Sequence, residues 1–508
     1  MNSKNMDLFN IKTIILLTFI FTVSSTKPNP KVIIIGTGPS GIAAGTKLYE
    51  NGIKNILWLE AENRIGGRLF THKFGANVID YGAQWCDGEK GNVVYEMAYP
   101  LGLLEYSNQS DVNLHLLQDF YTPQGQMLPR DECLKVAEIL GEAVGDIELL
   151  RQSNASVGEF LRSKYEEKVK TDLKDTDPNL VLYVLDWIYR ANSAYHAANS
   201  LYDVSTQGIV SYSDNEGDSL INWKGRGYKT ILDVLMKKLP DPKKALPLDD
   251  KILLNKEVNN IIWNSEPDQN MVTVKCSDGS EYKADHVIVT VSLGVLKDQI
   301  RTLFTPKLPR KKLNAIDNIQ FGTLDKLIFE FAQPWWPKNS TGYNFVWRES
   351  EIEEKIREFG DDVFSNTWLL DVTGFFPIEN QPNVLLGWIY GQSANHEESL
   401  PEEEVKSKVL KLMRMFLGKK FNIPEPVNFT RSKWATNKHF LGSYSYRSVN
   451  TEKSKVDDMD LANPLKNSAG KDVVLFAGEA TNAHRYGCVH GAIETGWREA
   501  DRLLKTYT

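Results

Sequence analysis

The stretch KVIIIGTGPSG, residues 31–41, indicates the fold. Its continuous apolar run predicts a buried strand that leads into three glycines and then a helix, a pattern typical of dinucleotide binding. Gly36 makes the turn, Gly38 leaves room for a phosphate, and Gly41 lets helix and sheet pack closely. Pro39 suits the first helical turn, where its missing N–H has no helical partner.

A second predicted strand, ILWLE at residues 56–60, ends in a carboxylate 24 positions after Gly36. Glu60 is therefore placed to accept hydrogen bonds from a ribose diol. Three spaced glycines alone also fit an ordinary glycine-rich turn. The strand before them, the helix after them and the acid at the second strand end make dinucleotide binding the stronger interpretation.

Length and composition describe an ordinary globular protein. A chain of 508 residues exceeds what one core usually serves, so we expect two domains. The net charge of −7 is spread without a basic stripe, which argues against a nucleic acid partner and suits a cationic substrate. The cysteines are too few and too widely spaced for a disulfide scaffold or a metal site, so we expect free thiols or at most one bridge, and no metal. They are Cys86, Cys133, Cys276 and Cys488.

The N-terminus has the layout of a signal peptide, assigned to residues 1–26. An apolar run at 14–23 follows two lysines and precedes the small residues 24–26. As a helix this run would reach about 15 Å, half of a roughly 30 Å hydrocarbon core, so no stable membrane span is expected. An uncleaved N-terminal anchor is the alternative to secretion. Sequons that a secreted chain would expose to glycosylation occur at Asn108, Asn154, Asn339 and Asn428.

Periodicity along the rest of the chain alternates between strand and helix. Helices are predicted within 131–200, with a core-facing stripe at Leu134, Ala137, Leu140, Ala143, Val144 and Ile147, and again near 402–416 and at the C-terminus. Strands are predicted at 77–81, 256–263, 271–276, 284–291, 324–331, 383–390 and 473–479, with Asp278-Gly279 turning the chain into the strand at 284–291. The charge-rich stretches 349–358 and 396–404 are interpreted as solvated helix faces.

Further motifs give the chain a recognisable pattern. The glycine-rich strand–helix turn is followed by EAENRIGGR (60–68), GAQW (82–85), FGTLDK (321–326), PWWP (334–337), GEAT (478–481) and VHGA (489–492). In this order, over nearly all of residues 31–504, the chain resembles the flavin-dependent amine oxidases, most of all their animal spermine and polyamine oxidase branch.

The resemblance implies an α/β, two-domain, FAD-linked amine oxidase fold, in which a Rossmann-type FAD-binding domain is interlaced with an α+β substrate domain. We assign 31–110, 220–305 and 455–508 to the FAD-binding domain, and 111–219 and 306–454 to the substrate-binding domain. FAD also suits the several separate glycine-rich segments, which must all approach one extended ligand.

By the same resemblance, Glu60 holds the adenosine ribose, Arg68 lies against the phosphates, the Val258 backbone faces the adenine, and Glu479 meets the ribityl and phosphate region. Val489 opens a helix whose dipole would stabilise negative charge on the flavin. The cofactor-binding set is completed by Gly36, Gly38, Gly41, Gly82, Ala83, Gln84 and Trp85. His490 is interpreted as a packed structural histidine.

The activity implied is hydride transfer from a polyamine such as spermine, spermidine or an acetylated form to flavin N5, giving an aldehyde, a shorter amine and, with oxygen, hydrogen peroxide. Lys326 matches the family lysine that holds a water near N5; its alternative, a surface lysine, fits less well beside Leu327, Ile328 and Phe329.

Substrate recognition is assigned to Asp87, which could pair with a remote ammonium, and to Tyr444 and Cys488. Tyr444 matches one of the two aromatic side chains that often flank the reacting carbon, whereas Cys488 takes the place of the other. A second acid found in plant enzymes would fall within 192–196, which holds no carboxylate. The alternatives are another amine substrate, such as a monoamine or amino acid, and a secreted flavin-binding protein without turnover.

Overall fold

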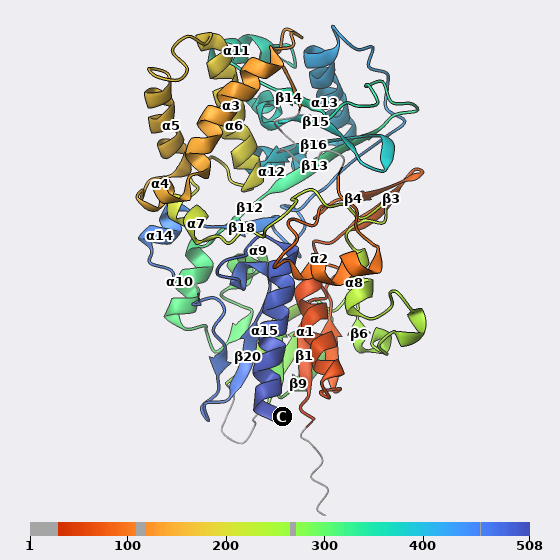
Figure 1. Cartoon of the computed structure of the whole chain (residues 1–508). Helices are drawn as coiled ribbons and strands as arrows, with labels where there is room; N and C mark the ends of the chain where they lie inside the picture. The colour runs from red at the N-terminus through yellow and green to blue at the C-terminus, as the bar shows by residue number, and fades with distance from the viewer. Residues whose placement is uncertain (1–28, 108–117, 265–270, 361, 458, 508) are drawn as a thin grey trace, which may run out of the picture.

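The structure is a computed structural model that describes residues 29–107, 118–264, 271–360, 362–457 and 459–507. The predicted signal peptide and the sequon at Asn108 lie outside these residues. In Figure 1 a parallel sheet with α1 and α15 forms one half of the molecule, and a second sheet with its own helices forms the other half. No helix of the described part is long and apolar enough to cross a membrane.

The first sheet has six strands in the order β19-β20-β10-β1-β2-β6. All neighbours pair in parallel except β19 and β20. Its central strands are continuous apolar runs because helices or a further sheet cover both faces. The strands are β1 (Val32–Ile35), β2 (Ile56–Leu59), β6 (Ile252–Leu253), β10 (His286–Val289), β19 (Leu465–Lys466) and β20 (Asp472–Phe476).

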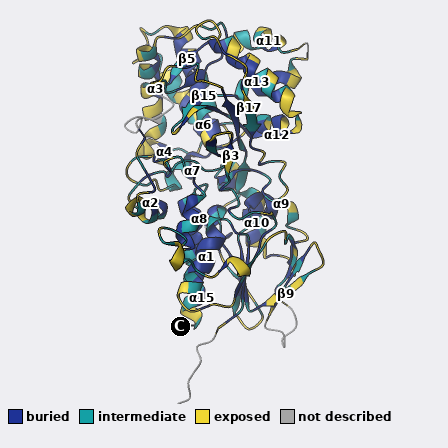
Figure 2. Ribbon diagram, turned by 90° about the vertical axis from the view of Figure 1, so that its right-hand side faces the viewer, coloured by how far each residue is buried: buried dark blue, intermediate teal, exposed yellow. Residues whose placement is uncertain are grey.

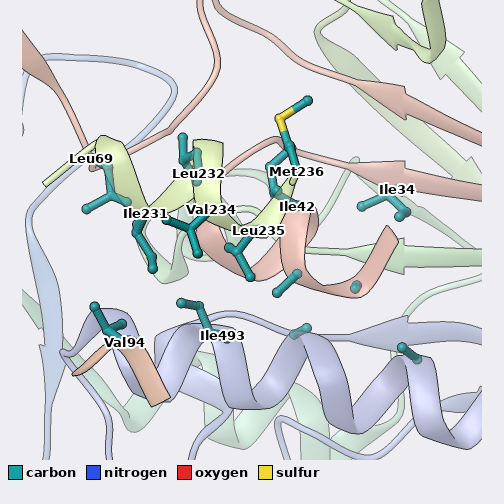
Figure 3. Close-up of a cluster of buried hydrophobic side chains, with 14 of the residues drawn as sticks. Ile34, Ile42, Leu69, Val94, Ile231, Leu232, Val234, Leu235, Met236 and Ile493 are labelled. Atoms are coloured by element: carbon teal, nitrogen blue, oxygen red, sulfur yellow. The ribbon is translucent and has the colours of Figure 1, made fainter. Parts of the chain in front are cut away.

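Alternate residues of β1 serve two cores. Val32 and Ile34 pack with the helices α1 (Pro39–Glu50) and α15 (Val489–Tyr507), whereas Ile33 and Ile35 pack against the second sheet. The side chains of α8 (Thr230–Leu235) cover α1, and Ile493 of α15 and Val94 of α2 (Val93–Ala98) close the same cluster (Figure 3).

Glycines permit the close contacts of this half. A Cβ on Gly41 would lie 2.1 Å from the Gly36 carbonyl oxygen, and one on Gly496 would lie 2.2 Å from the Ser40 carbonyl oxygen. These glycines let α1 approach the turn after β1 and let α15 approach α1. The predicted role of Gly41 in close packing is therefore confirmed.

The second sheet has the order β11-β7-β8-β9 and corrects one prediction. The Asp278-Gly279 turn leads into β9, residues Glu281–Ala284, which pairs with β8. The predicted strand at 284–291 is instead β10, which begins at His286 and belongs to the first sheet. Apolar periodicity finds strands but does not tell which sheet each one joins. The remaining strands are β7 (Val258–Ile262), β8 (Val272–Cys276) and β11 (Phe304–Thr305).

The third sheet has six strands in the order β17-β13-β16-β15-β14-β5, and its neighbouring antiparallel strands β13 and β16 place Lys326 opposite Trp388. Figure 2 shows its strands largely buried, with exposed residues on the outer faces of the surrounding helices. The strands are β5 (Asp119–Tyr121), β13 (Leu324–Glu330), β14 (Tyr343–Phe345), β15 (Gly374–Ile378), β16 (Gln381–Tyr390) and β17 (Asn428–Arg431). Helices around it include α3 (Arg130–Gly145), α5 (Val157–Lys168), α6 (Pro178–Tyr195), α11 (Glu349–Arg357), α12 (Gly391–Ser399) and α13 (Glu402–Leu417).

Two helical predictions need correction. The stripe predicted to end at Ile147 is interrupted, because α3 ends at Gly145 and Ile147 is an exposed residue of α4 (Ile147–Arg151). Within the stretch 396–404, Glu397 and Glu398 are buried rather than solvated. Arg431 of β17 donates to the Glu397 carboxylate at 2.7 Å, and this partner 34 residues away explains the burial.

The strands of the first two sheets all fall within 31–110, 220–305 and 455–508. Two elements depart from the predicted domain segments. Helix α10 (Arg310–Asn318) places Ala315 and Ile316 in the core between the first two sheets, and the hairpin of β3 (Thr71–Phe74) and β4 (Asn77–Asp80) packs on the third sheet. The remaining elements are α7 (Thr206–Ser211), α9 (Leu293–Gln299), α14 (Val449–Lys453), β12 (Gln320–Gly322) and β18 (Tyr444–Tyr446).

Candidate functional site

One cavity of about 730 Å³ extends from the turn after β1 to the third sheet and its helices. Every sequence-predicted site residue except Gly41 lines it, and Gly41 lies behind Gly36 in the helix turn. The lining residues from that set are Gly36, Gly38, Glu60, Arg68, Gly82, Ala83, Gln84, Trp85, Asp87, Val258, Lys326, Tyr444, Glu479, Cys488 and Val489.

At one end of the cavity, the turn after β1 leaves room for a phosphate. Gly36 has φ +102°, and a Cβ on Gly38 would meet nothing nearer than the Gly66 carbonyl oxygen at 4.0 Å. Gly38 caps α1 without a side-chain hydrogen bond, so free backbone N–H groups of the first turn remain to bind an anion. Glu60 is buried beside them and accepts from the backbone N–H of Thr37 at 2.8 Å.

In the middle of the cavity, an ion pair joins two segments that lie 411 residues apart. Arg68 donates through Nη1 to Glu479 at 2.9 Å and to the Ser443 carbonyl oxygen at 2.7 Å. The second oxygen of Glu479 accepts from the Ser445 hydroxyl at 2.6 Å and from the Gly487 N–H at 2.8 Å. The carboxylate is therefore fixed, and it orients the guanidinium at the cavity wall.

Lys326 is buried, which excludes the surface interpretation. Its Nζ donates to the carbonyl oxygens of Asp80 and Gly82, both at 2.8 Å, and to Oε1 of Gln84 at 2.9 Å. Burial lowers the pKa of Lys326 to about 8, and the nearby Asp80 partly opposes this effect. The lysine is thus a cation at neutral pH that holds the segment Gly82–Trp85 against the cavity and can lose its proton just above neutrality.

Two carboxylates, Asp87 and Asp214, line the cavity next to the segment Gly82–Trp85. Burial raises the pKa of Asp87 to about 6, and repulsion from Asp214 adds to the effect. Asn92 and Asn215 fix the Asp87 backbone by donating to its carbonyl oxygen at 2.8 and 3.1 Å. Sequence reasoning missed Asp214, which is exposed and follows α7 outside any motif.

Tyrosines form the walls around Cys488. The Tyr212 hydroxyl lies 2.8 Å from the Cys488 sulfur, and Tyr212 packs edge-on against Tyr486 with ring centroids 5.2 Å apart. Tyr444 donates to the Tyr195 carbonyl oxygen at 2.8 Å. Burial raises the pKa of Cys488 to about 12, so its thiol stays protonated and is not a nucleophile at neutral pH. Tyr212, also missed from the sequence, supplies an aromatic wall beside the cysteine.

The remaining sequence predictions concern His490, the cysteines and a metal site. His490 is buried, lies 3.2 Å from the Asn215 amide nitrogen, and has its pKa lowered to about 4 by burial and by Arg485. All four cysteines are free. Within the described residues, no group of three or more His, Cys, Asp or Glu side chains could hold a metal ion.

The sequence family described as flavin containing amine oxidoreductase matches residues 39–504. This chain belongs to that family. Its cofactor is FAD, and the turn at Gly36–Gly41, the buried Glu60 and the long cavity fit a dinucleotide.

Curated relatives of this oxidoreductase include polyamine oxidases and a protein named for steroid binding. It is 32% identical to the peroxisomal N(1)-acetyl-spermine/spermidine oxidase of Bos taurus, over 94% of each chain. It is 27% identical to polyamine oxidase 1 of Zea mays, over 94% of this chain and 90% of the relative. A corticosteroid-binding protein of Candida albicans is 26% identical, over 95% and 97%.

A solved structure supports the fold. Putrescine oxidase bound to putrescine matches with a TM-score of 0.65 and 18% identity, covering 94% of this chain and 99% of the other. At this identity the match shows that the two-domain flavin amine oxidase fold is shared.

Proposed function

We propose that the oxidoreductase oxidises polyamines, such as spermine, spermidine or their acetylated forms, with oxygen as the final electron acceptor. The observation that carries the proposal is the pair Asp87 and Asp214 in the same cavity as Lys326. Asp87 follows Gln84, a hydrogen-bond partner of Lys326, by three residues, so their Cα atoms are at most about 11 Å apart. This spacing suits an amine that carries a second positive charge several bonds from the reacting carbon.

The balanced reaction converts R–CH₂–NH–R′, oxygen and water into R–CHO, R′–NH₂ and hydrogen peroxide. FAD, when bound, supplies the hydride acceptor and the route of two electrons to oxygen. The carboxylates of Asp87 and Asp214 bind the remote ammonium and set the register of the chain. Tyr212 and Tyr444 provide an uncharged wall that favours the neutral form of the reacting amine. Lys326 holds a proton beside the cavity that can move as peroxide forms.

The relatives support this substrate class. Two are named as polyamine or acetylpolyamine oxidases, and the structural match is a putrescine oxidase. The relative named as a corticosteroid-binding protein shows why turnover must be tested directly.

The test is an anaerobic titration of the holoenzyme with spermine, spermidine and their acetylated forms, followed by product identification. We expect the flavin absorbance to bleach and an aldehyde to form. Bleaching by monoamines or amino acids alone would reject the polyamine assignment, and a flavin spectrum unchanged by every amine would indicate a binding protein.

We also propose that the chain enters the secretory pathway. The apolar run at 14–23 with small residues after it supports this proposal. The sequons at Asn154 and Asn339 are exposed, so their side chains would be accessible to a glycan, whereas the side-chain amide of the exposed Asn428 donates to the buried Glu330 carboxylate.

A further inference from the structure

The cavity continues beyond the tyrosines into the helical layer formed by α3, α5, α6 and α7. On α6, Ile188, Asn192 and Tyr195 line this extension. Their spacing of four and three residues places them on one helix face. From Ile188 to Tyr195 the helix rises about 10 Å, so these residues span that distance along the extension, which we call the arm.

Small residues of α3 leave the opposite wall open. Ala137, Gly141 and Gly145 follow each other at four-residue intervals and line the same arm. A Cβ on Gly141 or Gly145 would meet no heavy atom within 4 Å. Both glycines are exposed, so the open space beside them is continuous with solvent, and the arm reaches the surface there.

The arm differs in chemistry from the part that holds the carboxylates. Its walls include Val157, Trp187 and Ile209. At its Tyr195 end the arm adjoins Asp87 and Asp214, which act electrostatically on Tyr195. His196 also faces it, and burial lowers the pKa of His196 to about 4, so the imidazole is neutral at pH 7. One side of the cavity suits an ammonium, whereas the other suits an uncharged, apolar group.

We propose that this arm binds an extended apolar substituent on the substrate nitrogen. The preferred substrate is then an unsymmetrical amine, with a cationic end at Asp87 and Asp214 and a hydrocarbon chain of up to about 10 Å along α6. An apolar substituent fits the arm because the arm is continuous with the amine site and its walls are mostly uncharged. The inference rests on the proposed function, because it assumes that an amine occupies the adjoining part of the cavity.

The test compares N-octyl-1,3-diaminopropane with N-ethyl-1,3-diaminopropane in the holoenzyme. Each buried methylene is worth about fourfold in affinity, so six additional methylenes should lower KM at least tenfold even when only some are buried. Gly141→Leu adds an apolar side chain at the exposed outer end of the arm and should narrow it there, so the two substrates should have more similar KM values. Leucine favours helix more than glycine does, so this variant should fold.

Lys135→Leu is the matched control, because Lys135 is an exposed residue of α3 that does not line the cavity. It should keep the preference for the octyl compound. Equal KM values for both substrates in the wild type, or equal effects of Gly141→Leu on both, would overturn the inference and leave the arm as a solvent channel. If neither amine bleaches the flavin, the proposed function fails. Binding of the octyl compound near Trp187 can then be followed by tryptophan fluorescence. If that signal is absent, or is the same in Gly141→Leu, the proposal that the arm binds an apolar substituent is rejected independently of the proposed function.

Discussion

Replacing Lys326 with methionine separates a role in oxygen chemistry from a role in stability. Methionine has a similar length but removes the donor from three acceptors, the carbonyl oxygens of Asp80 and Gly82 and the side chain of Gln84. An acceptor left without its donor costs about 1–3 kcal/mol when buried, so about 6 kcal/mol is lost at the middle of this range.

Part of that loss is recovered, because methionine is uncharged and avoids the free-energy cost of burying the lysine ammonium. Burial shifts the pKa of Lys326 from 10.5 to about 8, which corresponds to about 3.4 kcal/mol against the charged form. We therefore expect Lys326→Met to lose about 2–3 kcal/mol of unfolding free energy, the difference between these two effects. FAD should remain bound, since the lysine contacts the protein segment rather than the phosphate end of the cavity.

Stopped-flow measurements of the two half-reactions test the functional part. Reoxidation of the reduced enzyme should slow in Lys326→Met. In the wild type it should decline as pH rises through about 8, because Lys326 then loses its proton; this limb should be absent from the variant. Urea unfolding measures the stability loss.

Lys312→Met is the matched control. Lys312 is also buried, with its pKa lowered to about 7, and it donates to the carbonyl oxygens of Asp460 and Leu461 at 3.0 and 2.7 Å, but it does not line the cavity. Its loss should reduce stability and leave reoxidation unchanged. Equal reoxidation rates in the wild type and Lys326→Met, or equal slowing in both variants, would refute the assigned role of Lys326.

Four further predictions address other parts of the molecule. Gly38→Val should prevent FAD binding by filling the space beside the helix turn, and a full complement of FAD in the purified variant would contradict this. Asp87→Asn should lower kcat/KM for spermine about tenfold to hundredfold and leave kcat/KM for monoamines unchanged. In the wild type, kcat/KM for spermine should fall as pH falls through about 6, where Asp87 gains a proton. Similar losses for spermine and for a monoamine would remove Asp87 from substrate recognition. Arg431→Met should destabilise the protein by about 3–5 kcal/mol by leaving Glu397 buried and unpaired, with partial recovery in the double variant with Glu397→Gln, as urea unfolding can measure. Protein from a secreting cell should begin shortly after residues 24–26, and N-terminal sequencing that finds Met1 on soluble cytosolic protein would reject secretion.

Local patterns were sufficient to predict the strand–turn–helix–strand unit at residues 31–60. The residues around Gly36 and Glu60 lie close in sequence, and their strands and helix pack directly on one another, so periodicity and turn chemistry determine them together. The same holds for the free cysteines and for the C-terminal helix that begins at Val489.

Contacts between distant segments could not be predicted in this way. The buried Glu397 depends on Arg431. The strand at His286 pairs with β1 and β20, where Val32 and Val474 lie 254 and 187 residues from their partners His286 and Val287. Asp214 approaches Asp87 only through the fold. The glycines of α3 do not indicate a cavity from the sequence alone, because glycine within a helix ordinarily signals only a less stable helix. In each case the deciding partner is remote in sequence.

The pairing of α1 with α15 has a consequence for biosynthesis. The cavity is lined by the turn at Gly36 and also by Glu479 and Val489, about 450 residues later in the chain. At about 5–20 residues per second, the first strand and helix wait on the order of 20–90 s for the segments that complete their sheet and their pocket. The cofactor can therefore enter only when translation is essentially finished. Until then the apolar faces of β1 and α1 stay exposed, and we expect chaperones to bind them.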